Sequence, residues 1–268
     1  MAEHMLALLG AGAMGSAVLE AVLRAGIVTP ERARITTLDE AAADRWRERG
    51  VVVAPDNAAA ADGADLVVVA VKPPDVPGVL DDIAPALGAD ALVVSLAAGV
   101  RLATLAQHLP AGAATVRVMP NTPALLGEGM AALSPGEHCG AEQLDLAREL
   151  LSACGQVVAV PEKQLDAVTA LSGSGPAYVF AIAEALIDGG VLLGLPRPVA
   201  TQLAVQTLLG SATMLRDSDT SPGLLREQVT SPGGTTAAAL REFDRHGLRS
   251  AIIAGMEAAQ ARSQELGG

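Results

Sequence analysis

Three glycines near the start of the sequence have the spacing of a dinucleotide-binding loop. The segment GAGAMG runs from Gly10 to Gly15, between an apolar stretch and an Ala-rich one. In this fingerprint the first glycine permits a tight turn, the second lets the backbone approach a pyrophosphate, and the third allows close helix packing. We therefore expect Gly10, Gly12, Ala13, Met14 and Gly15 to bind a dinucleotide.

The fingerprint also requires an acidic residue about 20 positions later, which binds the ribose hydroxyls. The segment TTLDEAAADRW offers Asp39 for this role. Two interpretations stay open, because Asp39 either binds the ribose or caps a helix that starts at Glu40. An acid here disfavours a 2′-phosphate, whereas Thr36 and Thr37 would accommodate one, so the choice between NADPH and NADH is open.

Polar residues follow two later apolar stretches. Lys72 comes in AVKPPDV, and Asn121 and Thr122 come in RVMPNTPALLGEG. Ligands of parallel sheets bind outside the carboxyl ends of the strands, so we expect Lys72 and Asn121 to line the nucleotide cleft. The alternatives are a solvated lysine and a simple turn.

Two segments in the second half carry more glycine and hydroxyl groups than helix capping requires. These segments are ALSGSGPAYVF, from Ala170, and VTSPGGTTAAAL, from Val229. One Ser or Thr is enough to cap a helix. We interpret both segments as helix starts whose backbone N–H groups bind a small anion.

The elements that must position these residues change character along the chain. Strands are predicted at Met5 to Gly10, Arg34 to Leu38, Asp65 to Val71, Ala91 to Ala98, Ala114 to Pro120 and Gln156 to Val160, with Ala-rich helices between them. Only helical patterns follow Pro161. The sequence therefore predicts an α/β fold, with a Rossmann-like parallel-sheet domain at 1–161 and a helical substrate-binding and dimerisation domain at 162–268.

The composition narrows the possible partners. The formal net charge of −12 and the scarcity of aromatic residues argue against nucleic acid. Two cysteines make no disulfide framework, no leader is apparent, and no apolar run has the length of a membrane span, so we expect a cytoplasmic protein. We expect no metal site and no catalytic histidine.

Together the motifs resemble those of the pyrroline-5-carboxylate reductase family. The matching segments, in chain order, are GAGAMG, AVKPPDV, SLAAGV, RVMPNTPALLGEGM, LSGSGPAYVF and VTSPGGTTAAAL. The resemblance implies hydride transfer from NADPH or NADH to the C=N bond of L-1-pyrroline-5-carboxylate, which gives L-proline in the last step of proline biosynthesis. It also implies a homodimer, and in some members a larger ring of dimers.

The resemblance further implies roles for individual residues. Asn57, Lys72 and Ala97 would lie by the cofactor, while Ser231, Gly234, Thr235 and Thr236 would hold the substrate carboxylate. Thr236 would also lie near the ring nitrogen, which makes it the candidate catalytic residue. The sequence departs from the family at Leu38 and Asp39, where many relatives carry residues that hold a 2′-phosphate.

Three alternative functions are open. β-Hydroxyacid dehydrogenases are similar in opening with a glycine loop, but they use a lysine on the first long helix of the second domain. No lysine follows Lys163 in this sequence, which disfavours that class. The remaining alternatives are another imine reductase and a nucleotide-binding dimer without catalysis.

Overall fold

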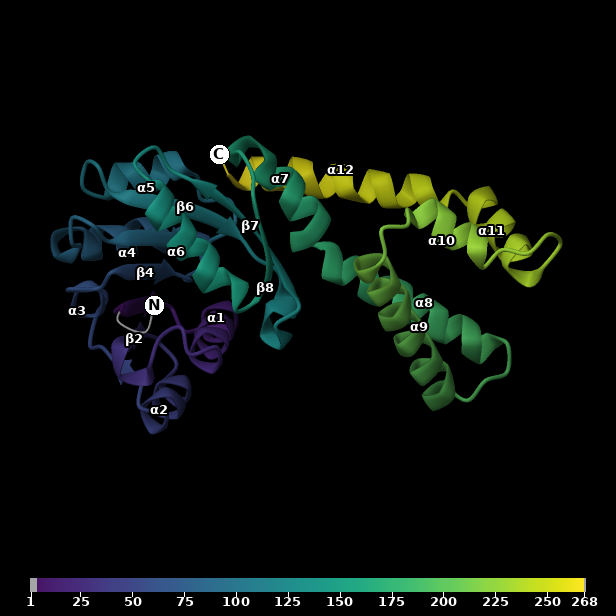
Figure 1. Cartoon of the computed structure of the whole chain (residues 1–268), viewed down its shortest axis with the longest axis horizontal. Coiled ribbons are helices and arrows are strands. Elements are labelled where there is room, and N and C mark those ends of the chain that lie inside the picture. Colours follow the sequence, from purple (N-terminus) through teal and green to yellow (C-terminus); the bar gives the residue numbers. More distant parts are fainter. Residues whose placement is uncertain (1–3, 268) are drawn as a thin grey trace. The chain divides into compact units, whose positions relative to one another are not determined.

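The computed structural model describes residues 4–267, which divide into two compact units (Figure 1). The first unit comprises the residues up to Ser174 and those from Ala259 onward, and the second runs from Gly175 to Ala258. The domain boundary predicted after residue 161 stays a prediction, because the first compact unit continues past it.

The first unit is built on a sheet that has eight strands in the described part of the chain. The strands are β1 (Leu6–Leu9), β2 (Ala33–Thr36), β3 (Val52–Val53), β4 (Leu66–Val69), β5 (Leu92–Ser95), β6 (Ala114–Met119), β7 (Gly129–Pro135) and β8 (Gly155–Ala159). Their order is β3-β2-β1-β4-β5-β6-β7-β8. All neighbours are parallel except β6 and β7, which confirms the predicted α/β fold with a mostly parallel sheet.

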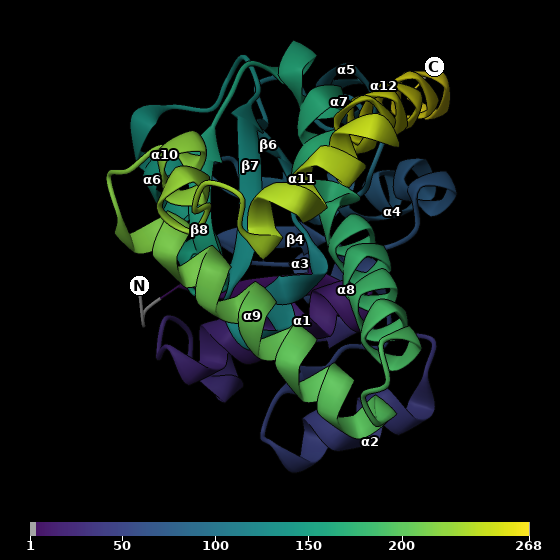
Figure 2. The ribbon, with the colours of Figure 1, turned by 90° about the vertical axis from the view of Figure 1, so that its right-hand side faces the viewer.

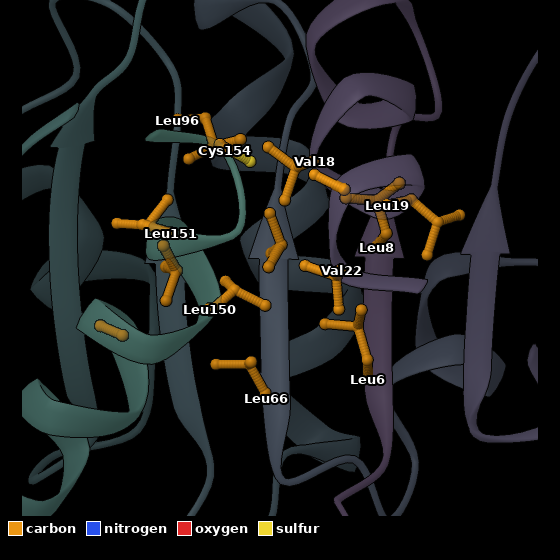
Figure 3. Packing of buried hydrophobic residues seen from close by; sticks show 14 of the residues in the cluster. Leu6, Leu8, Val18, Leu19, Val22, Leu66, Leu96, Leu150, Leu151 and Cys154 are labelled. Carbon is orange, nitrogen blue, oxygen red and sulfur yellow. The ribbon is translucent and has the colours of Figure 1, made fainter. Parts of the chain in front are cut away.

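The central strands are apolar throughout because both faces of the sheet are covered. Leu6 and Leu8 of β1 point into one hydrophobic core, and Ala7 and Leu9 point into the other. Figure 3 shows the first core, where side chains of the neighbouring helices pack around Leu6 and Leu8. This alternation holds each strand, and hence its carboxyl end, in a fixed register.

Helices of the first unit cover the two faces. They are α1 (Ala13–Arg24), α2 (Glu40–Glu48), α3 (Asn57–Ala61), α4 (Val76–Ile83), α5 (Leu102–His108), α6 (Ala141–Ser152) and α7 (Leu165–Val168). Short 3-10 turns lie at Pro30–Arg32, Pro73–Asp75, Ala84–Ala86, Thr122–Leu126 and Glu162–Gln164, and a π-helical turn lies at Thr169–Gly173. Helices α1, α2 and α6 contribute to one core, and α3, α4 and α5 to the other.

The second unit is helical, as predicted. It contains α8 (Gly175–Leu192), α9 (Arg197–Asp217), α10 (Pro222–Gln228), α11 (Thr235–Arg245) and most of α12 (Leu248–Leu266). Helices α8 and α9 pack against each other as a hairpin (Figure 2). Among its described residues only Ala200 and Ala204 are buried, so the unit has almost no core of its own.

Three expectations from the sequence need correction. Strands β3 and β7 were not predicted, because β3 has two residues and β7 is rich in Ala and Met, which favour helices. The segment LSGSG leads into α8 at Gly175, but it is not a free helix start, because the preceding residues Thr169–Gly173 already form a π-helical turn and Ser174 N–H donates to the Thr169 carbonyl. Finally, the stretch Glu162–Leu192 is long and apolar enough to cross a membrane by length and composition alone.

Candidate functional site

The three glycines of the loop differ in what surrounds them: contacts inside the protein require a glycine at Gly10 and Gly15, and Gly12 borders open space. Gly10 has φ of +93°, and a Cβ there would lie 2.7 Å from Cγ1 of Val71. A Cβ at Gly15 would overlap the carbonyl oxygen of Gly10. At Gly12 an added Cβ meets nothing within 4 Å, so this position is kept small without a contact inside the protein. Open space above Gly12 fits a ligand that approaches the backbone closely.

The N-terminus of α1 supplies hydrogen-bond donors beside that open space. The first intrahelical bond joins Ser16 N–H to the Gly12 carbonyl at 2.8 Å, so the N–H groups of Ala13, Met14 and Gly15 precede the helical ladder. Within the described residues no side chain caps this helix. Such a helix start attracts phosphate groups.

Asp39 caps α2, which was one of its two predicted roles. Its Oδ1 accepts a hydrogen bond from Ala41 N–H at 3.0 Å, and its own N–H donates to Thr37 Oγ1 at 3.2 Å. The neighbouring Leu38 is fully exposed. The cap fixes a carboxylate at the turn after β2 and leaves its second oxygen available for a ribose hydroxyl.

Asn57 lies in a chain of hydrogen bonds that sequence reasoning missed. Thr36 Oγ1 donates to Asn57 Oδ1 at 2.9 Å, and Asn57 Nδ2 donates to Asp82 Oδ2 at 3.0 Å. The two partners determine which end of the amide faces which way. Asp82 belongs to no recognisable motif, so the sequence carried no signal for it.

The parallel register brings the other predicted strand-end residues to one edge of the sheet. Leu9 pairs with both Thr36 and Val69, and Val69 pairs with Ser95. Lys72 is exposed just beyond β4, and Ala97 is buried just beyond β5. The glycine loop, Lys72 and Ala97 therefore follow neighbouring strands at the same edge.

Asn121, which follows β6, has a structural role beside its predicted place at that edge. Its Oδ1 accepts from Met130 N–H at 2.8 Å, and its Nδ2 donates to the Ser172 carbonyl at 3.1 Å. Gly173 lies close against Met119 at the end of β6. The structure thus joins the MPNTP and LSGSG segments, which are far apart in the sequence.

The segment VTSPGGTTAAAL starts α11 in the second unit. Gly233 has φ of +70°, and Gly234 N–H donates to the Ser231 carbonyl at 3.0 Å, which closes a turn. Ala238 N–H makes the first intrahelical bond, to Gly234, so the N–H groups of Thr235, Thr236 and Ala237 precede the ladder. A Cβ at Gly234 would overlap Ser231 Oγ.

No side chain in the described part of the chain caps α11, although Ser231, Thr235 and Thr236 lie at its start. Hydroxyl groups that do not cap the helix are free to contact a ligand. Together with the first-turn N–H groups they can bind a small carboxylate without a cationic side chain.

Other titratable groups in residues 4–267 lack the arrangement of a second centre. No group of three His, Cys, Asp or Glu side chains with metal-binding geometry occurs there. Arg117 is buried in β6 and pairs with Glu162 at 3.0 Å, and Glu162 Oε1 also accepts from Leu102 N–H at 2.7 Å. This pair, also missed from the sequence, ties a strand to two helical segments.

Known proteins match the chain over its whole length. Residues 162–266 match the family model "Pyrroline-5-carboxylate reductase dimerisation", and residues 5–99 match "NADP oxidoreductase coenzyme F420-dependent". A pyrroline-5-carboxylate reductase of Corynebacterium melassecola is 43% identical over 98% of both chains. The first of these models makes a dimer the expected assembly.

Solved structures agree with these matches. A pyrroline-5-carboxylate reductase from Coxiella burnetii is 35% identical, with a TM-score of 0.93 over 99% of both chains. The pyrroline carboxylate reductase of Plasmodium falciparum with NADP bound is 31% identical, with a TM-score of 0.90 over 100% of both chains. The glycine loop, the strand-end residues and the start of α11 are thus parts of a member of the pyrroline-5-carboxylate reductase family.

Proposed function

We propose that this protein reduces L-1-pyrroline-5-carboxylate to L-proline with NADPH or NADH, the last step of proline biosynthesis. The observation that carries the proposal is that, in a chain of this family, two glycine-rich segments start α1 and α11 without a side-chain cap. The first suits a pyrophosphate and the second a carboxylate, and these are anionic groups of the cofactor and the substrate.

The residues of the first unit fit the cofactor. When bound, NAD(P)H supplies the hydride, and the open face of Gly12 leaves room for its pyrophosphate. We propose that Gly10, Gly12, Ala13, Met14, Gly15, Asp39, Asn57, Lys72, Ala97 and Asn121 form the cofactor site. Among them Asp39 and Asn57 would face the adenosine ribose, since both lie beside the end of β2.

The start of α11 fits the substrate. The N–H groups of Thr235 and Thr236 donate to the carboxylate, together with the hydroxyl of Ser231, and Gly234 keeps the turn narrow. We assign the Thr236 hydroxyl to the ring nitrogen, which it orients by a hydrogen bond. The polar groups at the start of the helix would therefore bind both polar ends of a small cyclic imino acid.

The proposed reaction asks little of the protein beyond placement. The carbon of the protonated C=N bond accepts the hydride and forms a new C–H bond. The π-electron pair of the C=N bond passes to nitrogen, and the product is a secondary amine. Holding the imine carbon in line with the hydride donor contributes roughly 7 kcal/mol or more of the barrier reduction in well-oriented reactions. The reaction does not require a buried general base. The side chains at the start of α11, which can only hydrogen-bond, are therefore sufficient for it.

Loss of the Thr236 hydroxyl tests this assignment. Thr236→Ala should lower kcat roughly 100-fold, because a group that orients the reacting nitrogen acts mainly in the transition state. Nucleotide binding should be unchanged, which fluorescence titration measures, while the fall of reduced-nicotinamide absorbance gives kcat. The matched control is Thr213→Ala, whose hydroxyl bonds to the Leu209 carbonyl on α9.

Two results would contradict the proposal. Equal loss of turnover and nucleotide binding in Thr236→Ala would place this residue in the nucleotide site. A wild-type protein that binds NADH or NADPH but leaves the imine unreduced would instead be a nucleotide-binding dimer without this activity.

The exposed apolar surface of the second unit is proposed to be covered by a second copy of the chain. Val179, Phe180, Leu203, Leu209 and Ile252 are all exposed there. The family match over 162–266 includes the apolar stretch Glu162–Leu192, so a dimer interface accounts for it better than a membrane. This match also supports the functional boundary proposed after residue 161.

Sedimentation tests the dimer. The wild type should have twice the chain mass of 27.0 kDa, and Leu203→Glu should dissociate it, whereas Leu38→Glu in the first unit should not. A larger multiple would support a ring of dimers. A wild-type monomer at micromolar concentration would overturn the proposal, and release of membrane-bound protein only by detergent would favour a membrane span.

A cytoplasmic location and the absence of a nucleic-acid partner complete the proposal. The net charge of −12 disfavours polyanions, and the two cysteines, Cys139 and Cys154, are free thiols, as in a reducing compartment. Retention on a nucleic-acid column at physiological salt would contradict the absence of a nucleic-acid partner.

A further inference from the structure

The end of β2 borders the glycine loop directly. The Thr36 carbonyl accepts hydrogen bonds from Gly10 N–H at 3.0 Å and from Ala11 N–H at 2.9 Å. In dinucleotide-binding folds the adenosine ribose lies at this position, and the residues after the second strand contact its 2′ oxygen. The charges around Thr36 therefore decide whether a 2′-hydroxyl or a 2′-phosphate is accepted.

The helix start that would attract a 2′-phosphate already holds an anion of the protein. Asp39 Oδ1 accepts from Ala41 N–H in the first turn of α2. Glu40 adds a second carboxylate to the same turn. A phosphate at this place would compete with Asp39 for the N–H group and would be repelled by both acids.

The other side of Thr36 is also acidic. Asp56 caps α3, where its Oδ1 accepts from Ala59 N–H at 2.7 Å. Asp82 accepts a hydrogen bond from the amide of Asn57, and the same amide accepts a hydrogen bond from Thr36. Both helices that begin beside the end of β2 therefore carry an aspartate at their N-terminus, with Asp82 as a further carboxylate.

The nearby arginines are committed to other partners. Arg34 donates to the carbonyls of Ala59 and Asp62. Arg47 pairs with Asp44 at 2.7 Å and lies 3.7 Å from Glu40.

Further cations lie elsewhere. Lys72 follows β4, and since β1 separates β4 from β2, the spacing of strands puts their ends about 10 Å apart. Arg45 and Arg49 line a cavity of about 430 Å³ between α1 and α2, where Arg49 is paired with Glu20. Lys72 therefore suits the pyrophosphate, and Arg45 is a rival candidate for a phosphate.

We infer that this protein prefers NADH to NADPH, with Asp39 as the residue that sets the preference. The inference rests on the proposed function, because it names the cofactor of the same site. Asp39 accepts the 2′-hydroxyl of NADH through its second carboxylate oxygen, and it excludes the 2′-phosphate of NADPH.

Direct binding tests the preference without turnover. Titration of the full-length protein, followed by nucleotide fluorescence, should give a Kd for NADH about 10-fold below that for NADPH. Asp39→Ser retains a helix cap but removes the charge, and it should bring the two Kd values close to each other. Glu48→Gln is the matched control, because it removes the same charge about 12 Å from Glu40 along α2 and should leave the ratio unchanged.

Three results would overturn the inference. The first is a wild type that binds NADPH as tightly as NADH. The second is an unchanged ratio of the two Kd values in Asp39→Ser. The third is a selective loss of NADPH affinity in Arg45→Ala, which would place the 2′-phosphate in the cavity. If NADH binds preferentially but the imine is not reduced, the preference stands and the proposed function fails. Binding of neither nucleotide would overturn both.

Discussion

The position of the pyrophosphate can be tested by replacing Gly12 with alanine. The backbone of Gly12 has φ of −74° and ψ of −164°, a conformation that alanine adopts without strain. Its new Cβ would contact no protein atom within 4 Å. The variant should therefore fold as the wild type does, with the added methyl group standing only in the way of a ligand.

The expected magnitudes separate folding from binding. As an N-cap, alanine is less stabilising than glycine by about 0.5–1 kcal/mol. Alanine also lowers the conformational entropy of the unfolded chain, which stabilises the folded state by a similar amount, about 0.4–1 kcal/mol. The free energy of unfolding should thus change little. Each hydrogen bond from Ala13 or Met14 N–H to a phosphate is worth about 1.5–3 kcal/mol, so losing both raises the Kd at least roughly 100-fold.

Gly15→Ala is the matched variant, because its methyl group would overlap the Gly10 carbonyl oxygen inside the protein. Overpacking of this kind costs about 2 kcal/mol, which lowers the midpoint of thermal unfolding by roughly 4–8 °C. Fluorescence titration and thermal unfolding of both variants give the comparison. Wild-type NADH affinity in Gly12→Ala would refute the placement of the pyrophosphate over this glycine.

Three further predictions concern stability and reactivity. Asn121→Ala should lower the free energy of unfolding by about 2 kcal/mol in urea, because Met130 N–H and the Ser172 carbonyl lose their partner; an unchanged midpoint would contradict this. Glu162→Gln should cost about 3 kcal/mol in the same assay, since it leaves the buried charge of Arg117 uncompensated, and a smaller loss than for Asn121→Ala would count against it. Burial raises the pKa of Cys154 to about 11, so a thiol reagent at pH 8 should label it only after unfolding, and its contribution to stability, complete below pH 9, should be lost as the pH rises toward 11.

Local patterns allowed much of the fold to be predicted. The glycine loop before α1 and the helical character of the chain after Pro161 were both predicted from the sequence. Such features depend on neighbouring residues, whose spacing determines turn geometry and helix periodicity. The dinucleotide loop was therefore predictable as a unit, including the open position at Gly12.

Contacts between distant segments could not be predicted in the same way. The antiparallel strand β7 depends on pairing with β6, which overrides the helical preference of its residues. The bonds of Asn57 to Thr36 and Asp82 join three separate elements, and no spacing within the sequence announces them. Asp39 illustrates both cases. Its role as a helix cap could be predicted from the neighbouring residues, whereas the carboxylates that surround it in the fold could not.

In the proposed dimer, the near absence of buried residues between Gly175 and Ala258 within one chain makes the folding of this region depend on the partner. Its helices gain most of their stabilisation only when another chain is present, so the fraction folded depends on the protein concentration. A newly synthesised chain at low abundance would expose this region to proteases until it meets a partner.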